Sequence, residues 1–598
     1  MKFPYGISYF ERIITGGFYY CDRTDRIPLL EETGDTLLLI RPRRFGKSLL
    51  LSMLRHYYDA ARKEQFDMLF GHLKIGKKPT HLRNRYLILQ WDFSCVDPTG
   101  SAADIRRALF NHINTCISSF ALHYGSYLVS EPLIHPDDAL SSLGSLLSVV
   151  RKSGYPLYLL IDEYDNFANE VMTGIRDEHE IYKALVHEKG PLKTLFKAVK
   201  SAAGAGDIGR IFITGVSPVV MSDITSGFNI AENIYLKPAF NDLCGFTEEE
   251  AEKPLKAVGE KCGWEEKTVK EALHMMRTWY NGYIFSPRSE KRIYNPTLVL
   301  YFIKALKEEC LYPRRMLDAN LASDEAKLEY VSQLPGGQQI LLEITREKEP
   351  LTITDIADRF GIADMLSDAT KDHSFLASYL YYFGVVTIDG VQFDGKLELK
   401  VPNLVMRGLY VNRLQRLLLP NPVERDEGKF AADKLYSKGD MVPLCRFVEE
   451  KYFRVFHNPD YKWASEMTVK TAFLTLLYND TLYIMDSERE TGRGYADLTM
   501  IIRPDMRKYT IFDILIEFKY VKLGEAGLTG EQARQLTPEQ LQRIPAMIRQ
   551  MEDARKQLKR YGDELEKKHG NLRLRRYAVV ALGFERIWWE EKCCPAAA

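Results

Sequence analysis

The stretch Arg41-Pro42-Arg43-Arg44-Phe45-Gly46-Lys47-Ser48 decides the fold of the N-terminal half of the chain. An apolar run, residues 37–40, precedes it, and a mostly apolar run, residues 49–54, follows it. This order predicts a buried strand, a tight loop and a helix, and Gly-Lys-Ser at a helix start is where nucleotide phosphates bind. Backbone N–H groups surround the phosphates, the lysine reaches the β- and γ-phosphate oxygens, and the serine hydroxyl binds Mg²⁺. We therefore predict that ATP and Mg²⁺ bind here, with nucleotide contacts from Arg43, Arg44, Phe45, Gly46, Lys47, Ser48 and Leu49.

The loop departs from the usual motif at its first position. A glycine normally stands five residues before Gly46, whereas this chain has Arg41. The first position needs only a compatible backbone, but Gly46 must let a phosphate approach without a Cβ atom in the way. We therefore expect Arg41 to tolerate substitution better than Gly46.

Two acids directly follow a second apolar run. Asp162 and Glu163 come after residues 157–161. In P-loop ATPases an aspartate at this strand end holds Mg²⁺ through water, and the neighbouring glutamate can polarise the attacking water. An ordinary core strand followed by solvated acids would look the same, but this run follows a phosphate loop at the expected distance. We predict Asp162, together with Ser48, as a ligand of Mg²⁺, and Glu163 as a catalytic residue.

Two further strands are predicted in this half of the chain. Residues 86–91 form an apolar run with an acid, Asp92, near its end, and residues 210–213 end in small polar residues. At the end of the latter run, Thr214 or Ser217 could contact the γ-phosphate, and we predict Thr214 as part of the nucleotide site. The three strand ends together indicate an ATPase.

Composition narrows the possible classes of protein. The chain has 598 residues, which is too long for one core and predicts three or four domains. Because 81 basic residues balance 81 acidic ones, any nucleic-acid surface must be a local patch. Nine scattered cysteines without metal-ligand spacing predict reduced thiols and a cytoplasmic protein. The chain starts without the apolar core of a signal peptide, and no apolar run approaches the roughly 20 residues that span a membrane, so no membrane association is expected.

The periodicity of the chain changes several times. Residues 1–240 alternate strands and helices, which predicts a parallel sheet covered on both faces. Residues 241–330 turn helical and open with the capping box of Thr247 and Glu250, and the aromatic cluster at residues 279–285 is interpreted as the core of this helical lid. In residues 331–445, the segment 351–360 looks like the first helix of a helix-turn-helix, followed by a helix near 375–383 and a hairpin over 384–401. A winged-helix-like connector fits this order, and so does a packing adaptor that never touches DNA.

The N-terminal half resembles the bacterial and archaeal AAA-ATPase-like family, which is commonly fused to a PD-(D/E)XK nuclease-like domain. Arg41 is itself typical of that family. The resemblance implies a P-loop NTPase parallel sheet with a helical lid, a winged-helix-like connector, and a restriction-endonuclease-like α/β domain at residues 446–598. The matching motifs are Tyr5-Gly6, residues 41–48, Trp91-Asp92-Phe93-Ser94, Asp162-Glu163-Tyr164-Asp165, Thr214-Gly215-Val216-Ser217 and residues 279–285.

The C-terminal region is predicted to contain a helix, three strands, a helix and a strand, in that order. It also carries a second set of acidic residues. Alternation in a strand puts Glu517 and Lys519 on one face, and Asp497 on the paired strand can meet them. Two carboxylates and a lysine suit hydrolysis with Mg²⁺, with Asp497 and Glu517 as metal ligands and Lys519 orienting or deprotonating the attacking water. With Glu466 on the preceding helix, this set resembles the PD-(D/E)XK superfamily, although Ala496 stands where the name has proline. Two residues of the long helix, Gln557 and Tyr561, match a glutamine-to-tyrosine element that some members carry.

Residues 542–576 hold eleven lysine and arginine residues against five acidic ones. A basic helix beside such a site can neutralise phosphates, and a solvated helix with ordinary ion pairing has the same composition. One interpretation is an ATPase coupled to a Mg²⁺-dependent nuclease that acts on nucleic acid. DNA is favoured over RNA without excluding it, and a homo-oligomer is also compatible. The alternative is a nucleotide-gated switch or nucleic-acid-binding protein whose nuclease-like domain is a non-cleaving docking module.

Overall fold

The structure is a computed structural model that describes residues 1–97, 99–166, 190–224, 228–318, 325–334, 336–344, 350–358, 373–456, 466–485, 497–570 and 572–592. The chain divides into two compact units. Unit 1 comprises residues 1–310, 330–340 and 351–402, and unit 2 comprises residues 311–329, 341–350 and 403–598. Residues of α15 (Glu325–Gln333) and α16 (Gly337–Ile344) are divided between the two units.

A five-stranded parallel sheet forms the centre of unit 1. Its strand order is β2-β3-β4-β1-β5, which confirms the predicted parallel sheet. Strands that are covered on both faces read as continuous apolar runs, and every residue of β3 is buried. The phosphate-loop strand β1 and the acidic strand β3 are not neighbours, because β4 lies between them. The bounds are β1 Thr36–Ile40, β2 Leu87–Asp92, β3 Leu157–Asp162, β4 Ile208–Gly215 and β5 Glu232–Asn233.

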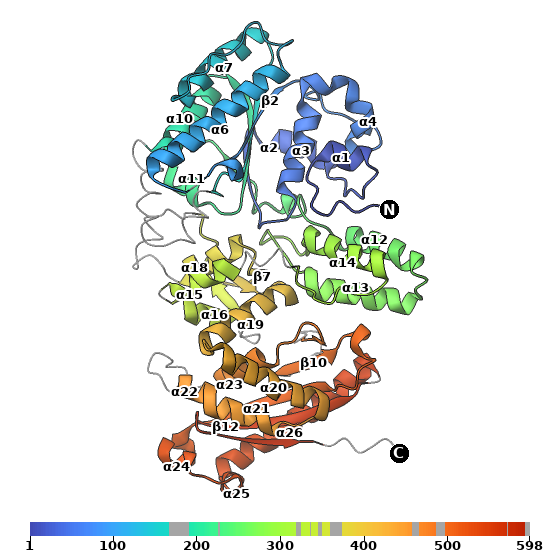
Figure 1. Cartoon of the computed structure of the whole chain (residues 1–598), viewed down its shortest axis with the longest axis vertical. Helices are drawn as coiled ribbons and strands as arrows, with labels where there is room; N and C mark the ends of the chain where they lie inside the picture. The colour runs from blue at the N-terminus through green and yellow to red at the C-terminus, as the bar shows by residue number, and fades with distance from the viewer. Residues whose placement is uncertain are drawn as a thin grey trace. The chain divides into compact units, whose positions relative to one another are not determined.

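Helices cover both faces of this sheet. Figure 1 shows α3 on one side and α6, α7 and α10 on the other. The helix after the phosphate loop, α3, buries nine of its twelve residues, including Lys47. The bounds are α1 Phe10–Thr15, α2 Ile27–Thr33, α3 Lys47–Tyr58, α4 Phe66–Phe70, α5 Lys74–Lys77, α6 Ala102–His123, α7 Ala139–Ser153, α10 Pro191–Gly204 and α11 Val219–Ile224.

The helical lid consists of α12 (Glu248–Lys261), α13 (Glu266–Tyr280) and α14 (Pro296–Glu309). The predicted capping box of α12 is present in full. Cys262, the C-cap of α12, and Cys310, the C-cap of α14, form a disulfide with 5.7 Å between their Cα atoms. This corrects the expectation that all cysteines are reduced. The pair is 48 residues apart in the chain, and only the packing of the lid helices brings it together.

The connector region contains a three-stranded antiparallel sheet of order β6-β8-β7 and helix α18 (His373–Tyr382). The helix predicted near residue 375 and the hairpin of β7 (Thr387–Val391) and β8 (Leu397–Lys400) are confirmed. The helix predicted from residue 351 is wrong at its start, since Leu351–Ile353 form β6. Leu351 and Ile353 alternate inward and pair with β8, which a β-branched stretch favours. The remainder of a helix-turn-helix falls on residues 359–372, outside the described residues.

Unit 2 is built on a second five-stranded sheet of order β13-β12-β11-β10-β9. Strands β11 and β12 are parallel, and the other neighbours are antiparallel. The predicted order of helix, three strands, helix and strand is present, and β13 extends it by one strand. The predicted turn at residues 492–494 and Ala496 lie outside the described residues. The bounds are β9 Tyr483–Ile484, β10 Leu498–Ile502, β11 Asp513–Val521, β12 Leu574–Leu582 and β13 Arg586–Glu591.

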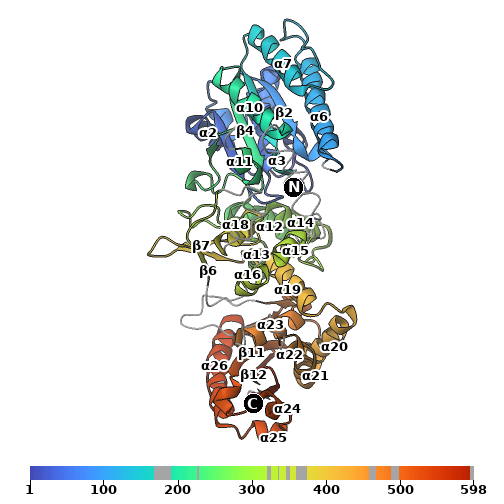
Figure 2. The same ribbon diagram turned by 90° about the vertical axis from the view of Figure 1, so that its left-hand side faces the viewer.

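Two separate cores cover the faces of this sheet. Figure 2 shows α26 on one side and α20 to α23 on the other. Leu515 and Val521 pack with α26, whereas Ile516 and Phe518 pack on the opposite side. There the ring centroids of Phe518 and Phe473 of α23 are 4.9 Å apart. The alternation predicted for β11 is therefore present. The bounds are α19 Leu404–Leu418, α20 Pro422–Lys438, α21 Val442–Phe447, α22 Phe453–Phe456, α23 Glu466–Leu477, α24 Gly530–Arg534, α25 Pro538–Leu541 and α26 Pro545–His569.

Candidate functional sites

The phosphate loop leaves β1 and enters α3. Gly46 is the N-cap of α3 with a φ of +94°, a backbone conformation that favours glycine. Lys47 begins the helix and is buried, and Ser48 follows it on the exposed side. The Lys47 Nζ atom donates to the carbonyl oxygens of Arg41, at 3.0 Å, and Pro42, at 3.2 Å. Burial lowers the pKa of Lys47, so an incoming anion would stabilise its charged form.

A cavity of about 330 Å³ opens beside this loop. Residues 44–50 line one wall, and residues 4–8 and 19–21 line another. The start of α14 and the segment 243–246 complete it. Its volume lies in the range of small-molecule sites, and its wall combines aromatic rings with a few charged groups, as such sites do. The charged groups on the wall are Arg23, Arg44, Lys47 and Glu163.

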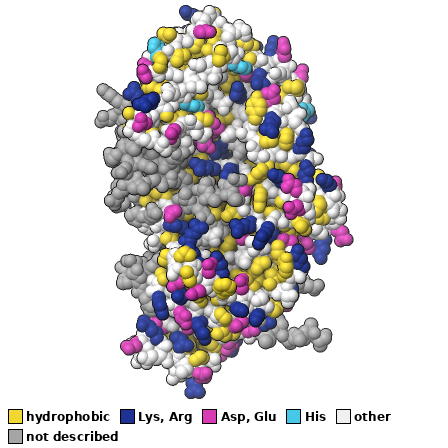
Figure 3. Space-filling view, in the orientation of Figure 1, with side chains coloured by type: hydrophobic (Ala, Val, Ile, Leu, Met, Phe, Trp, Pro, Cys, Tyr) yellow, Lys and Arg dark blue, Asp and Glu magenta, His cyan; other side chains and the backbone are white. Residues whose placement is uncertain are grey.

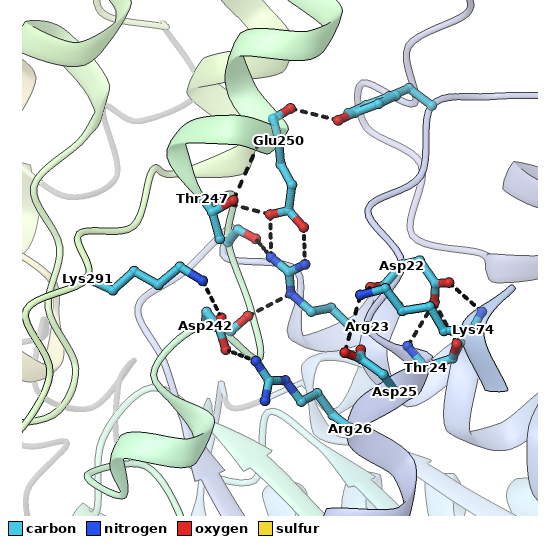
Figure 4. Close-up of polar contacts among 12 residues, drawn as sticks. Asp22, Arg23, Thr24, Asp25, Arg26, Lys74, Asp242, Thr247, Glu250 and Lys291 are labelled. Carbon is cyan, nitrogen blue, oxygen red and sulfur yellow. Dashed lines mark hydrogen bonds and ion pairs between the residues drawn. The ribbon is translucent and has the colours of Figure 1, made fainter.

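Ion pairs tie the N-terminal segment to the lid beside this cavity (Figure 4). Arg23 pairs with Glu250 of α12 and donates from Nε to the carbonyl oxygen of Asp242 at 2.7 Å. The Asp242 carboxylate also accepts from Arg26 and Lys291, each at 2.8 Å. Burial alone would raise the pKa values of Asp242 and Glu250, but the bonds from Lys291 and Arg23, respectively, lower them. We refer to these five residues as the clasp. Sequence reasoning missed Arg23, because no local pattern links it to a helix more than 200 residues away.

The acids at the end of β3 lie next to the loop and to β4. Asp162 is buried and accepts the Thr214 hydroxyl, so β4 supplies a donor that fixes this carboxylate. Glu163 has a φ of +48°, an uncommon conformation for a residue other than glycine, and it lines the cavity. Burial raises the pKa of Glu163, against the charge of Lys47. The Ser217 hydroxyl is bound to Asp165 at 3.0 Å. Both predicted γ-phosphate contacts therefore donate to carboxylates here, and the role of Thr214 at the nucleotide stays a prediction.

The other predicted loop residues divide into two groups. Arg44 and Leu49 line the cavity, and the Arg44 Nη1 atom is buried without an acceptor among the described residues. The charge of Arg43 weakly opposes the rise in the pKa of Glu163 that burial causes. Phe45 is buried edge-on against Tyr283, at 4.9 Å between ring centroids, and also touches the cavity.

Arg41 contradicts the premise that the first loop position needs only a compatible backbone. Its side chain is buried, with 1% exposed, and its guanidinium group is bound to three backbone carbonyl oxygens. A smaller side chain would leave those carbonyls without donors inside the protein. Tolerance of substitution at Arg41 is therefore no longer expected.

In unit 2 the structure brings the predicted acids and lysine together. Asp497 precedes β10, and its Oδ2 atom accepts from the Phe518 N–H at 2.9 Å, which fixes it beside β11. Lys519 Nζ donates to Glu517 Oε1 and to the Phe518 carbonyl oxygen, each at 2.9 Å, and lies 3.9 Å from Glu466. Glu517 is fully buried, and Asp497 is 3% exposed. Burial lowers the pKa of Lys519, but the charges of Glu517 and Glu466 outweigh it, so this pKa is raised.

The donors at both sites suit Mg²⁺. Among the described residues, no group of three or more His, Cys, Asp or Glu side chains could hold a metal ion. Magnesium keeps several waters and needs only one or two carboxylates, which Asp497 and Glu517 provide. At the phosphate loop, the hydroxyl of Ser48 and the carboxylate of Asp162 are the corresponding hard oxygen donors.

Much of the predicted basic patch is already paired within unit 2. Arg555 binds Glu590, Arg575 binds Glu591, and Arg576 contacts Asp563 and Glu566. On the face that Figure 3 shows, basic and acidic side chains lie side by side over much of the surface. Tyr561 is buried and accepts a bond from Arg560 at 2.7 Å, and Gln557 is half-buried on the same helix. These contacts fit ordinary ion pairing at least as well as a phosphate-binding face.

Comparisons with known proteins agree with this division. A family model described as Predicted AAA-ATPase matches residues 4–225, and a PD-(D/E)XK nuclease superfamily model matches residues 464–591. An uncharacterized protein in the vnfD 5′ region of Azotobacter chroococcum mcd 1 is 26% identical over 552 residues, or 89% of this chain and 92% of that protein.

Two solved structures show weak overall likeness. A Walker-type ATPase of Pyrococcus abyssi is 13% identical and covers 65% of this chain and 94% of its own, with a TM-score of 0.35. The ORC1 protein of Aeropyrum pernix, solved in complex with DNA, is 13% identical and covers 66% of this chain and 92% of its own, with a TM-score of 0.25. At these scores the likeness adds nothing to the strand order described above.

Among the described residues, no helix combines the length and the apolar character that a membrane span requires. The family matches, the parallel sheet with its phosphate loop, and the second sheet with its paired acids agree on one division of the chain. The chain combines an N-terminal predicted AAA-ATPase-like domain with a C-terminal domain of the PD-(D/E)XK nuclease superfamily.

Proposed function

We propose that the protein binds and hydrolyses ATP at the phosphate loop. The observation that carries this proposal is the environment of the Lys47 ammonium group, which is buried, bound to the carbonyl oxygens of Arg41 and Pro42, and open to a cavity of about 330 Å³. The Nη1 atom of Arg44 at the same cavity has no acceptor in the described part of the chain, which favours an anionic ligand. A nucleoside triphosphate supplies that charge together with a planar aromatic base, whose ring faces can pack against the aromatic part of the wall.

The chain's own residues divide the work of hydrolysis. The N–H groups at the start of α3 and the Lys47 ammonium would hold the phosphates, and Ser48 and Asp162 would hold Mg²⁺, which neutralises charge on the transferred group. Thr214 keeps the Asp162 carboxylate in place. Glu163 would orient the attacking water, and its raised pKa makes it a better proton acceptor than an ordinary carboxylate.

We further propose that the C-terminal domain cleaves nucleic acid with Mg²⁺. Asp497 and Glu517 would hold the metal ion, which lowers the pKa of a bound water. Because the pKa of Lys519 is raised, its ammonium form would orient this water and the scissile phosphate rather than remove a proton. DNA is the favoured substrate over RNA.

One observation favours the alternative of a non-cleaving docking module. Three of the seven arginines in residues 542–576, namely Arg555, Arg575 and Arg576, already have acidic partners, which leaves fewer cations for phosphates. Incubating purified protein with labelled DNA and RNA, with Mg²⁺ or Mn²⁺ and with or without ATP, separates the two functions. Cleavage that disappears in Glu517→Ala supports the nuclease, whereas binding without cleavage under every condition supports the docking module.

Four parts with boundaries at residues 240, 330 and 445 remain our proposal for the domain organisation, with residues 331–445 as the winged-helix-like connector. We also propose a cytoplasmic location and allow for a homo-oligomer. Limited proteolysis with mass spectrometry tests the boundaries. If free thiols are blocked in intact cells before purification, mass spectra of the peptides also report whether Cys262 and Cys310 form a disulfide inside the cell.

A further inference from the structure

The face of the phosphate loop that points away from the cavity is anchored by one buried side chain. The Arg41 guanidinium group donates to the carbonyl oxygens of Ile40, Tyr235 and Phe240 at 2.8, 2.9 and 2.7 Å. Its central carbon lies 4.2 Å from the centroid of the Phe285 ring. One side chain therefore links the end of β1, the segment after β5, and the lid.

Two other loop residues, Pro42 and Phe45, are also held by neighbouring segments. A Cβ atom added at Gly384 would lie 2.8 Å from the Pro42 ring, which shows how closely the connector approaches the loop. Phe45 packs edge-on against Phe285 at 5.2 Å, and its carbonyl oxygen accepts from the Gly245 N–H at 3.1 Å. All of these segments belong to unit 1.

This anchoring reaches the reactive side of the loop through backbone atoms. Lys47 Nζ is bound to the carbonyl oxygens of Arg41 and Pro42, so the residue whose side chain anchors the loop also holds the lysine. An incoming triphosphate would draw the ammonium group from these carbonyls toward its own oxygens. The N–H cradle then keeps its shape only if the backbone of residues 41–46 stays in place.

We propose that Arg41 is a positioning residue for the phosphate loop and that it couples the nucleotide site to the lid through Phe285. This inference rests on the proposed binding of ATP. It also explains why a large cation can replace the usual glycine, since the first loop position points away from the phosphates. The competing explanation is that Arg41 only stabilises the core.

A second buried arginine provides a matched control. Arg210 is 5% exposed, and its guanidinium group donates to the carbonyl oxygens of Leu30, Glu31 and Gly34. It lies near the start of β4, at the opposite end of the sheet from the loop. Arg41→Lys and Arg210→Lys each replace a planar guanidinium group with an amine that cannot make the same fork of hydrogen bonds, so both should lower the melting temperature.

The experiment compares ATP affinity by calorimetry, and kcat and KM for hydrolysis, in the wild type and both variants. We expect Arg41→Lys to raise the Kd and KM for ATP about tenfold with a smaller change in kcat, because a displaced loop weakens binding of substrate and transition state alike. Arg210→Lys should leave all three constants near the wild-type values.

The outcomes are distinguishable. If both variants bind ATP as the wild type does, Arg41 is a core residue and the inference is wrong. If the wild type itself binds no ATP, the proposed function fails instead. Should Arg41→Lys not fold, Phe285→Leu replaces it: the stacking contact is lost while the position stays apolar, and we expect the Kd to rise about threefold. An unchanged Kd in that variant would overturn the coupling through Phe285.

Discussion

The two candidate sites each contain a buried lysine, and their surroundings shift its pKa in opposite directions. Lys47 lies against backbone carbonyl oxygens, and burial lowers its pKa. Lys519 lies against Glu517 and near Glu466, and their charges raise its pKa. The first lysine gains stability when an anion arrives, whereas the second already has its counter-charge within the chain.

This difference separates two ways of preparing a site for phosphate chemistry. The phosphate loop offers positive charge and N–H donors, so the ligand supplies the negative charge. The carboxylate site offers negative charge with one ammonium group, so a metal ion must complete it before a phosphodiester can approach. The predictions below test whether the two sites depend on these different partners.

Replacing Lys47 should have the largest effect. In Lys47→Ala we expect ATP hydrolysis to fall by at least about 10³-fold, the scale of a single cation in phosphoryl transfer, with weaker ATP binding. Glu163→Gln should keep ATP binding and lose turnover, because only the water-orienting carboxylate changes. Phosphate release and nucleotide binding are measured side by side. Equal hydrolysis in wild type and Lys47→Ala would refute the phosphate-loop assignment.

Removing the carboxylates of unit 2 should abolish the other activity only. Asp497→Ala and Glu517→Ala should each lower Mg²⁺-dependent cleavage by about 10²- to 10³-fold, while ATP hydrolysis stays unchanged. Lys519→Ala should lose cleavage but keep the metal, since it supplies no oxygen ligand. Titration with Mn²⁺, followed by electron paramagnetic resonance, separates these classes. Loss of Mn²⁺ binding in Lys519→Ala would contradict the assigned roles.

The clasp should make unit 1 sensitive to acid. The pKa values of Asp242 and Glu250 are lowered in the folded state, so their contribution to stability is complete above about pH 5 and is lost as the pH falls through the lowered values. In Glu250→Gln we expect a loss of about 1–3 kcal/mol at pH 7, because Arg23 keeps a weaker partner. Denaturant titrations of both proteins at several pH values should converge as the carboxylates become protonated, and a constant difference down to pH 2 would argue against the ion pair.

Charge removal on α26 should have the smallest effect. Lys559 is exposed and no acidic partner is described for it, whereas Arg555 is paired with Glu590. If the helix contacts phosphates, Lys559→Ala should lower the slope of log Kd against log salt by about one unit, and Arg555→Ala by less. Fluorescence anisotropy with labelled DNA measures both slopes. Identical slopes in all three proteins would favour a solvated helix without a nucleic-acid role.

Much of this architecture could be predicted because the decisive signals are local. The loop of Gly46 and Lys47 lies between a buried strand and a helix, and an unbroken apolar run before Asp162 predicts β3. On β11, strict alternation placed Glu517 and Lys519 on one face. In each case one strand or one turn contains the whole pattern, so no knowledge of distant contacts was needed.

The features that were predicted wrongly or missed mostly depend on contacts between segments that are far apart in the chain. Arg23 meets Glu250, Arg41 meets Phe240 and Phe285, and Cys262 meets Cys310 only through packing of segments far apart in the chain. A strand of three residues such as β6 lacks a full period, so its residues also fitted a helix. Counting charges over residues 542–576 could not foresee that β13 supplies Glu590 to Arg555 and Glu591 to Arg575. It also could not foresee that Arg576 of β12 pairs with Asp563 of α26.

The position of β4 between β1 and β3 has a consequence for synthesis of the chain. Strand β1 ends at residue 40, but its partner β4 begins only at residue 208, and β5 follows still later. During translation, both edges of β1 therefore remain unpaired until most of the domain has been synthesised, although the strand is almost wholly apolar. A chain arrested before residue 208 should expose an unpaired apolar strand that can pair with other chains, and it should need a chaperone to avoid aggregation. The phosphate loop, the first motif to be made, is thus among the last to become competent for its ligand.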